Sequence, residues 1–492
     1  MNQRINLPLR NPSCPDEQGE LELTFRDPAG QLLLTEHHAL RRIRPAAVDD
    51  TLAFLASPLR ASLERSGDLV LSEIEEPVTQ PHEISGEIWL RHPRIDPISY
   101  PCEWTVAQWQ AAAELTLRIA KLAINAGWTL KDATPLNVLF AGPRPVFVDV
   151  LSFERRNPNS STWLAYGQFV RTFLLPLVAA KFLKWPLQAT LFSRDGYEPS
   201  MLYRALPRWR RLNPDLFDVV TLAALFERSN GKLQKERKPL ADVDPELAKH
   251  ILHKRIDRLG RQIRHVAETG SKSQWSEYTQ SASHYQAADV NQKQEFVRGV
   301  LERNRPGHVL DIGANTGTYS RMASAAGAEV VAIDSDEAAI EALWRAAAQK
   351  EQPITALVAN IARPTPAAGW KNREQLSLLE RLNGKFDMVL MLAVIHHLIL
   401  REQLPLAHIS ELCSSLTRRW LILEWVPPSD PMYREWLRGR DELYGSLSES
   451  DLLSAFSPFF RVLDRTELGN RRVVLLFELK DSEASPGEAS PA

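Results

Sequence analysis

Cysteine is scarce in this sequence: Cys14, Cys102 and Cys413 are the only three among 492 residues, and they lie far apart. A disulfide framework needs paired cysteines, and a structural zinc site needs closely spaced ligands such as Cys-x-x-Cys. We therefore expect neither a disulfide scaffold nor a zinc site built from cysteines, and we assign no metal ligands on this basis.

Long hydrophobic runs are missing as well. The most apolar stretch, residues 173–180, contains Pro176 and lies between Arg171 and Lys181. Because a membrane-spanning helix needs about 20 apolar residues, we expect no membrane span. Residues 1–14 lack the apolar core of a secretory signal, which predicts a cytoplasmic protein.

An excess of one charge is also absent, since 59 Lys and Arg oppose 61 Asp and Glu for a net charge of −2. This balance provides no overall attraction to a polyanion, so we do not expect a nucleic-acid partner. Residues 228–272 are the exception: 12 basic and 6 acidic residues give them a net charge of +6, which leaves −8 for the rest of the chain.

The length predicts several domains, because a typical domain has about 100–200 residues. The basic segment separates them: we expect an N-terminal α+β domain over residues 1–228, a basic helical linker over 229–272, a C-terminal domain over 273–480 and a disordered tail over 481–492. Apolar residues in the linker recur at helical spacing. This helix either packs on one domain with a solvated basic face, or meets RNA, an acidic protein or a membrane surface.

The strongest motif is HVLDIGANTGTYS at residues 308–320. It predicts a strand over 309–312, a turn of small residues over 313–317 and a helix over 319–326. A second strand over 329–333 ends at Asp334, 21 residues beyond Gly313. A strand, glycine turn, helix, strand and terminal acid together indicate one half of a doubly wound α/β fold.

The ligand of this turn differs from a dinucleotide. The pattern is D-x-G-x-N-x-G rather than G-x-G-x-x-G, and the carboxylate of Asp311 would repel a diphosphate. Asp311 suits a ligand with an ammonium group, and Asp334 could accept hydrogen bonds from both hydroxyls of a ribose.

These residues resemble the class I S-adenosylmethionine-dependent methyltransferases, and four later segments follow in that family's order, namely 356–360, 386–398, 420–425 and 472–478. The resemblance implies a Rossmann-like methyltransferase domain with S-adenosylmethionine as cofactor. Asn360 stands where the family often has Asp at the adenine edge. The cofactor-binding residues that the resemblance implies are Asp311, Gly313, Ala314, Asn315, Gly317, Asp334, Asn360 and Ala393.

His396 and His397 follow the fourth strand of this domain, where the methyl group would point. One of them could be a general base, or they could line the cofactor pocket without proton transfer, or be structural. A metal site with Glu424 would need a geometry that the sequence does not show. The aromatic residues Trp275 and Tyr278 precede the first strand, where they either close over the ligand or pack in the core.

The N-terminal domain carries a second motif, WTLKDATPLNVLF at residues 128–140, after a predicted helix that begins at Thr105 and stops at Gly127. It resembles the catalytic loop of protein kinases and aminoglycoside-type kinases. The likeness implies that Asp132 orients an acceptor hydroxyl, that Asn137 and Asp149 hold Mg²⁺, and that the lobe binds ATP.

This kinase-like motif departs from the family. Residue 130 is Leu rather than His, there is no glycine-rich loop, and no lysine precedes Lys121, so that only Arg91 offers a substitute for the phosphate-binding lysine. An active kinase, a degenerate nucleotide- or substrate-binding lobe and a purely structural likeness therefore stay open.

The two motifs in one chain resemble bacterial nodulation-associated or uncharacterised class I methyltransferases. Our first hypothesis is an enzyme that moves a methyl group from S-adenosylmethionine to an oxygen or nitrogen of a small molecule or saccharide. The alternatives are a nucleotide-responsive binding or scaffold protein with a kinase-like lobe, and an RNA methyltransferase. The acceptor and the oligomeric state are not set by the sequence.

Overall fold

A computed structural model describes residues 21–24, 27–75, 86–230, 243–268, 287–437 and 439–480. The predicted disordered tail over 481–492, the aromatic residues Trp275 and Tyr278 and part of the predicted linker lie outside the described residues.

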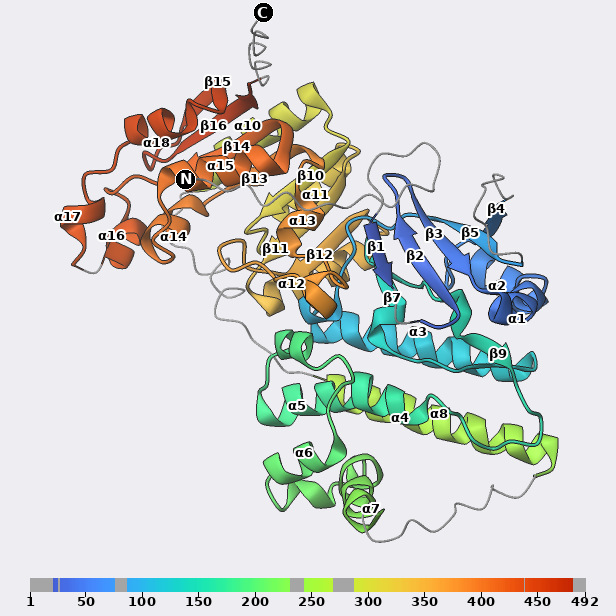
Figure 1. The fold of residues 1–492 in the computed structure, drawn as a ribbon. Coiled ribbons are helices and arrows are strands. Elements are labelled where there is room, and N and C mark those ends of the chain that lie inside the picture. Colours follow the sequence, from blue (N-terminus) through green and yellow to red (C-terminus); the bar gives the residue numbers. More distant parts are fainter. Residues whose placement is uncertain are drawn as a thin grey trace, which may run out of the picture.

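The C-terminal domain is built on a seven-stranded sheet with the strand order β12-β11-β10-β13-β14-β16-β15 (Figure 1). Neighbouring strands from β12 to β14 are parallel, whereas β16 is antiparallel to both β14 and β15. The doubly wound Rossmann-like fold predicted from the sequence is confirmed. The strands are β10 (His308–Ile312), β11 (Glu329–Asp334), β12 (Ile354–Val358), β13 (Phe386–Met391), β14 (Thr417–Trp425), β15 (Phe460–Glu467) and β16 (Val473–Leu479).

Both faces of this sheet are covered by helices, which explains why its strands are almost continuously apolar. Along β10, Val309 packs into one core and Leu310 into another on the opposite face. The helices of this domain are α10 (Ala287–Asn304), α11 (Thr318–Ala325), α12 (Glu337–Gln349), α13 (Leu378–Leu382), α14 (Ile395–Leu400), α15 (Leu406–Leu416), α16 (Pro431–Leu437), α17 (Asp441–Tyr444) and α18 (Glu449–Phe456).

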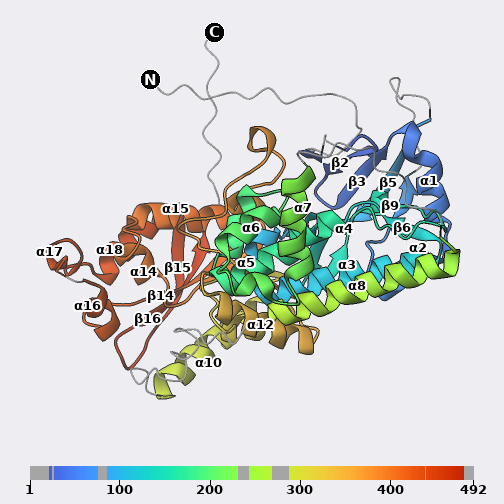
Figure 2. The same ribbon diagram turned by 90° about the horizontal axis from the view of Figure 1, so that it is seen from below.

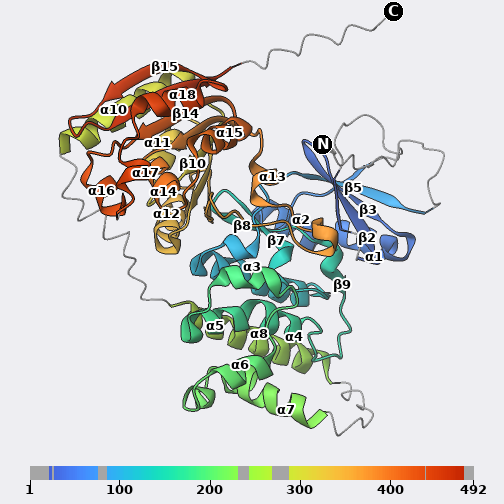
Figure 3. The same cartoon turned by 60° about the vertical axis from the view of Figure 1, so that its left-hand side comes forward.

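The N-terminal domain begins with a five-stranded antiparallel sheet in the order β1-β2-β3-β5-β4, with two helices beside it (Figure 3). The connection between the first two strands contains Pro28 and Ala29. These elements are β1 (Leu21–Thr24), β2 (Gly30–Leu34), β3 (His38–Ile43), α1 (Pro45–Leu55), α2 (Pro58–Ser66), β4 (Glu73–Glu75) and β5 (Ile88–Pro93).

A helical subdomain follows, organised around α3 (Val106–Asn125). Thr105 caps this helix by accepting a hydrogen bond from the Gln108 amide, and Gly127 ends it with a positive φ of 79°, as predicted. The remaining elements are β6 (Trp128–Leu130), β7 (Val138–Ala141), β8 (Arg144–Phe147), β9 (Phe153–Arg155), α4 (Tyr166–Phe169), α5 (Leu175–Leu183), α6 (Pro199–Ala205), α7 (Ala223–Asn230) and α8 (Pro245–Ala267).

Most of the basic segment forms α8, which lies along α3 (Figure 2). Its apolar stripe, including Leu252 and Ile263, is buried, and part of its basic face is used within the molecule. Arg258 pairs with Asp218, and Arg264 with Glu114. The helix therefore packs on the N-terminal domain. No helix within the described ranges is long and apolar enough to cross a membrane.

The two domains share a continuous buried core, in which Trp104 and Ala356 both take part. At the start of α3, the Gln108 side chain donates a hydrogen bond of 2.9 Å to the Ala356 carbonyl oxygen of β12. The indole N–H of Trp344, on α12, donates one of 2.9 Å to the carbonyl of Pro143, in the turn between β7 and β8. The strand and helix that flank Asp334 are thus fixed to the N-terminal domain.

The same interface contains a fully buried ion pair between Arg381 of α13 and Glu103, with exposed fractions of 1% and 0%. Two parallel hydrogen bonds of 3.0 and 2.5 Å join the guanidinium to the carboxylate. Arg381 also donates to the carbonyl of Ile98 and stacks over the ring of Tyr100. A charge at this depth is stable only with its partner in place.

Replacing Arg381 with Met leaves Glu103 buried without a counter-charge. We expect the free energy of unfolding to fall by about 3–5 kcal/mol, measured by urea denaturation. Adding Glu103→Leu should recover most of this loss, because no unpaired charge then remains. As a control, Arg303→Met breaks the exposed pair with Asp464 and should change stability by less than about 1 kcal/mol. A similarly small effect for Arg381→Met would contradict the analysis.

Candidate active site

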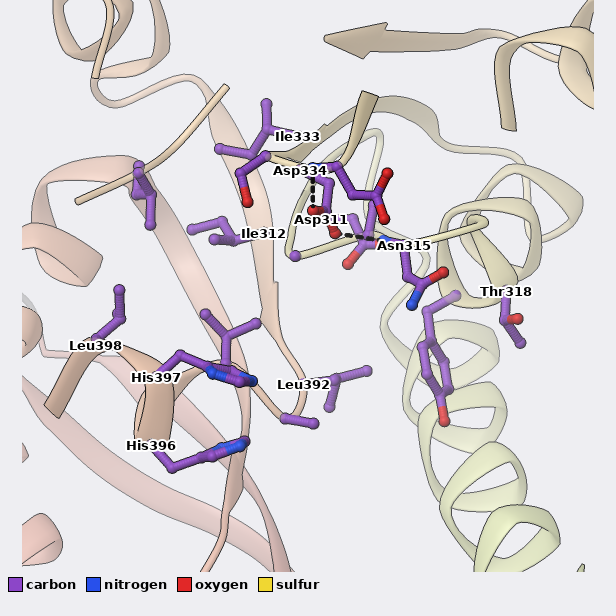
Figure 4. Close-up of a pocket in the computed structure, with 18 of the residues that line it drawn as sticks. Asp311, Ile312, Asn315, Thr318, Ile333, Asp334, Leu392, His396, His397 and Leu398 are labelled. Carbon is purple, nitrogen blue, oxygen red and sulfur yellow. Dashed lines mark hydrogen bonds between the residues drawn. The ribbon is translucent and has the colours of Figure 1, made fainter. Parts of the chain in front are cut away.

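A cavity of about 540 Å³ opens at the carboxyl ends of β10, β11 and β13, where the strand order reverses direction (Figure 4). This is the position at which doubly wound sheets bind their ligands. Seven of the eight predicted cofactor residues line this cavity; the other, Gly317, does not. They are Asp311, Gly313, Ala314, Asn315, Asp334, Asn360 and Ala393.

The turn after β10 depends on two glycines with positive φ. Gly313 has a φ of 73°, and a Cβ there would lie 2.3 Å from a methyl carbon of Val394. Gly317 has a φ of 77°, and a Cβ there would lie 2.1 Å from Leu343 on α12. Side chains at these positions would be strained and would collide, so the backbone of the turn approaches its neighbours closely. Gly317 therefore allows the turn to pack closely against α12, and it does not line the cavity.

Asp334 ends β11 with its carboxylate held by the backbone. Its two oxygens accept hydrogen bonds from the amides of Asn315 and Asp336, both at 2.9 Å (Figure 4). Burial raises the pKa of Asp334, and these amide bonds oppose that rise. The carboxylate is fixed in orientation, and each oxygen has a further lone pair for a ribose hydroxyl.

Asp311 lies at the end of β10, only 2% exposed, and accepts a hydrogen bond of 2.6 Å from the Ser320 hydroxyl. Burial, with a contribution from the charge of Asp334, raises the pKa of Asp311 to about 6. A cationic group beside it would reverse part of that shift. This carboxylate therefore fits the ammonium of S-adenosylmethionine.

Asn360 follows β12 at the edge of the cavity. Its side-chain oxygen accepts a hydrogen bond of 2.9 Å from the Ala362 amide, which fixes the side chain in a turn. The amide NH₂ group is thereby directed as a donor, suited to a ring nitrogen acceptor of an adenine. With Asp311, Asp334 and the glycine turn, the donor and acceptor groups present fit S-adenosylmethionine.

The two predicted histidines extend from α14 toward the cavity (Figure 4). Their ring centroids are 4.1 Å apart, and the ring of Trp436 meets His397 edge-on at 5.2 Å. His396 is 4% exposed, and its Nδ1 has no hydrogen-bond partner among the described residues. Burial, reinforced by His397, Arg472 and Lys293, lowers the pKa of His396 well below its ordinary value. Burial also lowers the pKa of His397 to about 4.

Behind the histidines lies a buried ion network that sequence analysis did not find. Glu424, at the end of β14, bonds to Lys293 of α10 and, at 3.2 Å, to Arg472. Arg472 also pairs with Asp430 at 2.8 Å. Burial acts to raise the pKa of Glu424, but the two cations lower it below its ordinary value. The partners are separated by up to 131 residues in the chain, so no local spacing reveals the network.

Glu424 was considered above as a metal ligand together with the histidines. Its carboxylate oxygens are instead engaged by Lys293 and Arg472. Within the described ranges, no group of three His, Cys, Asp or Glu side chains could hold a metal ion.

The structure also brings together two of the three predicted kinase-like residues. Ser152 donates a hydrogen bond to Asp149 and receives one of 3.2 Å from Asn137. Asp132 instead accepts a hydrogen bond of 3.2 Å from Gln168, which also fixes the Ala133 amide. All three side chains are therefore held by protein groups.

Arg41 of β3 contributes to this cluster and was not recognised in the sequence. Its guanidinium pairs with Asp149 at 2.9 Å, and both side chains are largely buried. Arg91, considered as a substitute for the missing lysine, pairs with Glu73 and Glu75 instead. A positive charge therefore lies where the kinase resemblance would place a magnesium ion.

Comparison with known proteins identifies the C-terminal domain. Residues 310–416 match a methyltransferase domain family. The chain is also 28% identical over 471 residues to the nodulation protein NoeA of Rhizobium meliloti (strain 1021), which covers 94% of this chain and 96% of NoeA.

Solved structures also match part of the chain. Magnesium protoporphyrin IX methyltransferase (ChlM) of Synechocystis PCC 6803 matches at 19% identity and a TM-score of 0.29, over 44% of this chain and 92% of ChlM. The N-methyltransferase NodS of Bradyrhizobium japonicum WM9 matches at 11% and 0.30, over 40% of this chain and 98% of NodS. The bifunctional kinase-methyltransferase WbdD matches at 19% and 0.30, over 39% of this chain and 40% of WbdD.

The methyltransferase family match falls on β10 to α15, the segment that contains the glycine turn, Asp334 and both histidines. Together with the parallel sheet order and the cavity at its carboxyl edge, it identifies this domain as a class I methyltransferase. The chain is an S-adenosylmethionine-dependent methyltransferase.

Replacing Asp334 with Asn removes the charge that we expect to bind the ribose. The dissociation constant for S-adenosylmethionine, measured by calorimetry, should rise by about 100-fold, or about 3 kcal/mol. Glu329→Gln, at the exposed opposite end of the same strand, is the matched control and should bind like the wild type. Unchanged binding by Asp334→Asn would place the cofactor elsewhere.

Proposed function

We propose that this S-adenosylmethionine-dependent methyltransferase transfers the methyl group to an oxygen or nitrogen nucleophile of a small molecule or saccharide. The observation that supports this most directly is the unpartnered Nδ1 of His396, which is buried in the wall of the cavity that also contains Asp311 and Asp334. A buried acceptor without a partner is costly, and an O–H or N–H group of a substrate would satisfy it.

In this proposal, residues of the glycine turn and of the strand ends hold the cofactor. Asp334 would bind the ribose hydroxyls, Asp311 the ammonium group and Asn360 the adenine edge. When bound, S-adenosylmethionine supplies an electrophilic methyl group on a sulfonium. The task left to the protein is to align the acceptor with that methyl group and to exclude water.

His396 would orient the acceptor rather than deprotonate it in advance. Its low pKa keeps the imidazole neutral at physiological pH, so one ring nitrogen is available to accept a hydrogen bond from the acceptor. The same low pKa makes it a weak base. A hydroxyl becomes strongly acidic as its oxygen gains the methyl group, so a weak base suffices to receive the proton late in the transfer. A methylated amine needs no base at this point, because it can leave as the ammonium ion and lose its proton to solvent.

The charges behind His396 set the electrostatics of this wall. Lys293 and Arg472 oppose the carboxylates of Glu424 and Asp430, so the network as a whole is neutral. A neutral wall gives no net electrostatic attraction to a charged acceptor. It therefore suits an uncharged hydroxyl or amine. NoeA, the relative that spans nearly the whole chain, is named a nodulation protein, which supports a related role without naming an acceptor.

The N-terminal lobe would then support the methyltransferase domain rather than transfer phosphate. The Arg41 guanidinium and the Ser152 hydroxyl occupy the carboxylate of Asp149, the group that would otherwise bind Mg²⁺. The direct hydrogen bonds from this lobe to Ala356 and from Trp344 agree with a supporting role.

His396→Leu removes the proposed hydrogen-bond acceptor. We expect kcat for methyl transfer to fall about 100-fold, followed with labelled S-adenosylmethionine and the acceptor fraction of a cell extract, while cofactor binding by calorimetry stays unchanged. His396→Asn, which keeps a hydrogen-bonding group at the same point, should retain at least a tenth of wild-type kcat. Equal loss in both variants would point to a packing role.

The pH profile tests the same residue independently. The pKa of His396 lies well below its ordinary value and that of His397 is about 4, so wild-type kcat should show no midpoint near pH 6.5 and should fall only at more acidic pH, where the imidazoles gain protons. A midpoint near pH 6.5 in the wild type would show that the reacting histidine is exposed to solvent and is not the buried one.

For the N-terminal lobe, we expect calorimetric titration with ATP and Mg²⁺ to give no binding tighter than about 1 mM, because Arg41 already neutralises Asp149. Asp149→Ala should leave this result unchanged. Micromolar binding that Asp149→Ala abolishes would contradict the proposal and would restore the nucleotide-binding alternative.

A further inference from the structure

Exposed apolar side chains gather in one short part of the chain, residues 192–226. Of the nineteen large hydrophobic residues that are exposed within the described ranges, eight lie in these 35 residues. Phe192, Leu212 and Trp209 are the most exposed of them, at 86%, 70% and 68%. Contiguous apolar exposure of this kind usually marks an interaction surface.

Residues 191–194 lie at the domain interface, where Leu191 packs on the cluster of Ile98 and Tyr100 and Arg194 pairs with Glu374. The rest of this part of the chain, residues 199–226, lies at the end of the molecule that α6 and α7 form, away from the methyltransferase sheet (Figures 1 and 3). None of its residues lines the cofactor cavity. Neither catalysis nor the domain interface described above therefore explains why its apolar side chains face outward.

Basic residues accompany the apolar ones. Residues 199–212, with the sequence PSMLYRALPRWRRL, contain four arginines and no acid. Arg204 and Arg208 are exposed, and neither forms an ion pair with any residue that the structure describes. Arg210 lies over the ring of Trp209 at 4.3 Å, which supports the exposed indole from one side.

Two of the acids that follow this segment face away from it. Asp218 pairs with Arg258 at 2.8 Å, and Asp215 lies 3.6 Å from His265, so both are turned toward α8. Arg210 also reaches a cleft that contains Glu337 and Glu341, so it is left out of the surface. The surface, which we call the basic-apolar tip, consists of Arg204, Arg208, Trp209 and Leu212.

We propose that the basic-apolar tip docks on an anionic lipid bilayer. A leucine side chain on a short turn can enter the acyl boundary, tryptophan prefers the interfacial layer, and arginines beside them contact lipid phosphates. A nucleic acid would use the arginines and could stack on Trp209, but it would leave Leu212 in water. The chemistry of the tip therefore favours a lipid surface, to which the protein binds peripherally.

The test uses the full-length protein and vesicles of phosphatidylcholine with 30% phosphatidylglycerol, compared with pure phosphatidylcholine, in a co-sedimentation assay. We expect binding to the anionic vesicles that weakens between 50 and 500 mM NaCl. The Arg204→Gln, Arg208→Gln double variant should bind about 25-fold more weakly, at about fivefold for each charge near the surface. Trp209→Glu should weaken binding by at least tenfold.

Matched controls use the same substitutions away from the tip. Trp370→Glu replaces an indole that is 58% exposed on the methyltransferase domain, and Arg65→Gln removes an exposed charge from α2; both should bind like the wild type. Because Trp209 is exposed, its variant should keep the wild-type melting temperature, S-adenosylmethionine affinity and methyl transfer to a dissolved acceptor.

Three results would overturn the proposal. The first is no difference between anionic and neutral vesicles, or no binding to either. The second is equal binding by the tip variants and their controls. The third is salt-dependent RNA binding, or a doubling of the molecular mass in solution, that Trp209→Glu abolishes while vesicle binding is absent.

Discussion

The buried pair between Arg381 and Glu103 is the interaction on which the arrangement of the two domains depends. A guanidinium and a carboxylate with almost no exposure must stay together, because either one alone in the core would be strongly destabilising. Around this pair, the Gln108 side chain at the start of α3 bonds to β12, and the Trp344 indole of α12 bonds to the turn between β7 and β8. A continuous apolar core joins the same elements. The domains therefore form one packed unit at this interface, rather than two domains connected only by a linker.

This constraint extends to the cofactor site. Helix α12 begins directly after Asp334, and β12 leads to Asn360, so the elements that present both residues rest on the N-terminal domain. The amides of Val106 and Ala107, at the free N-terminus of α3, donate to the carboxylates of Glu337 and Glu341 on α12. Negative charge at a helix N-terminus is stabilising, which strengthens this junction. Support for the methyltransferase domain is a physical role that the N-terminal lobe can fill without phosphate transfer.

The sequence predicts local features well and distant pairings poorly. The strand, glycine turn and acid over residues 309–334 follow directly from apolar runs and from Gly313 and Gly317, whose positive φ no other residue adopts easily. The cap at Thr105 is equally local. By contrast, Arg41 and Asp149 are 108 residues apart, and sequence analysis named Arg91 rather than Arg41 as the basic residue of this site. Only the packing of β3 in the sheet places Arg41 beside Asp149. The His396 position was predicted, but its neutral, unpartnered state comes from burial.

What the sequence by itself determined is the strand, glycine turn, helix and acidic strand end over residues 309–334 and the position of the histidines along the chain, because each depends on local spacing. The class of the domain followed from the resemblance of these and later segments to a known family. Only the tertiary structure decided which charges neutralise one another. Lys293, Glu424 and Arg472 come from three separate elements, and Glu103 and Arg381 come from two domains. In the low dielectric of a core, these pairings fix both the wall of the active site and the docking of the domains, and no local pattern encodes them.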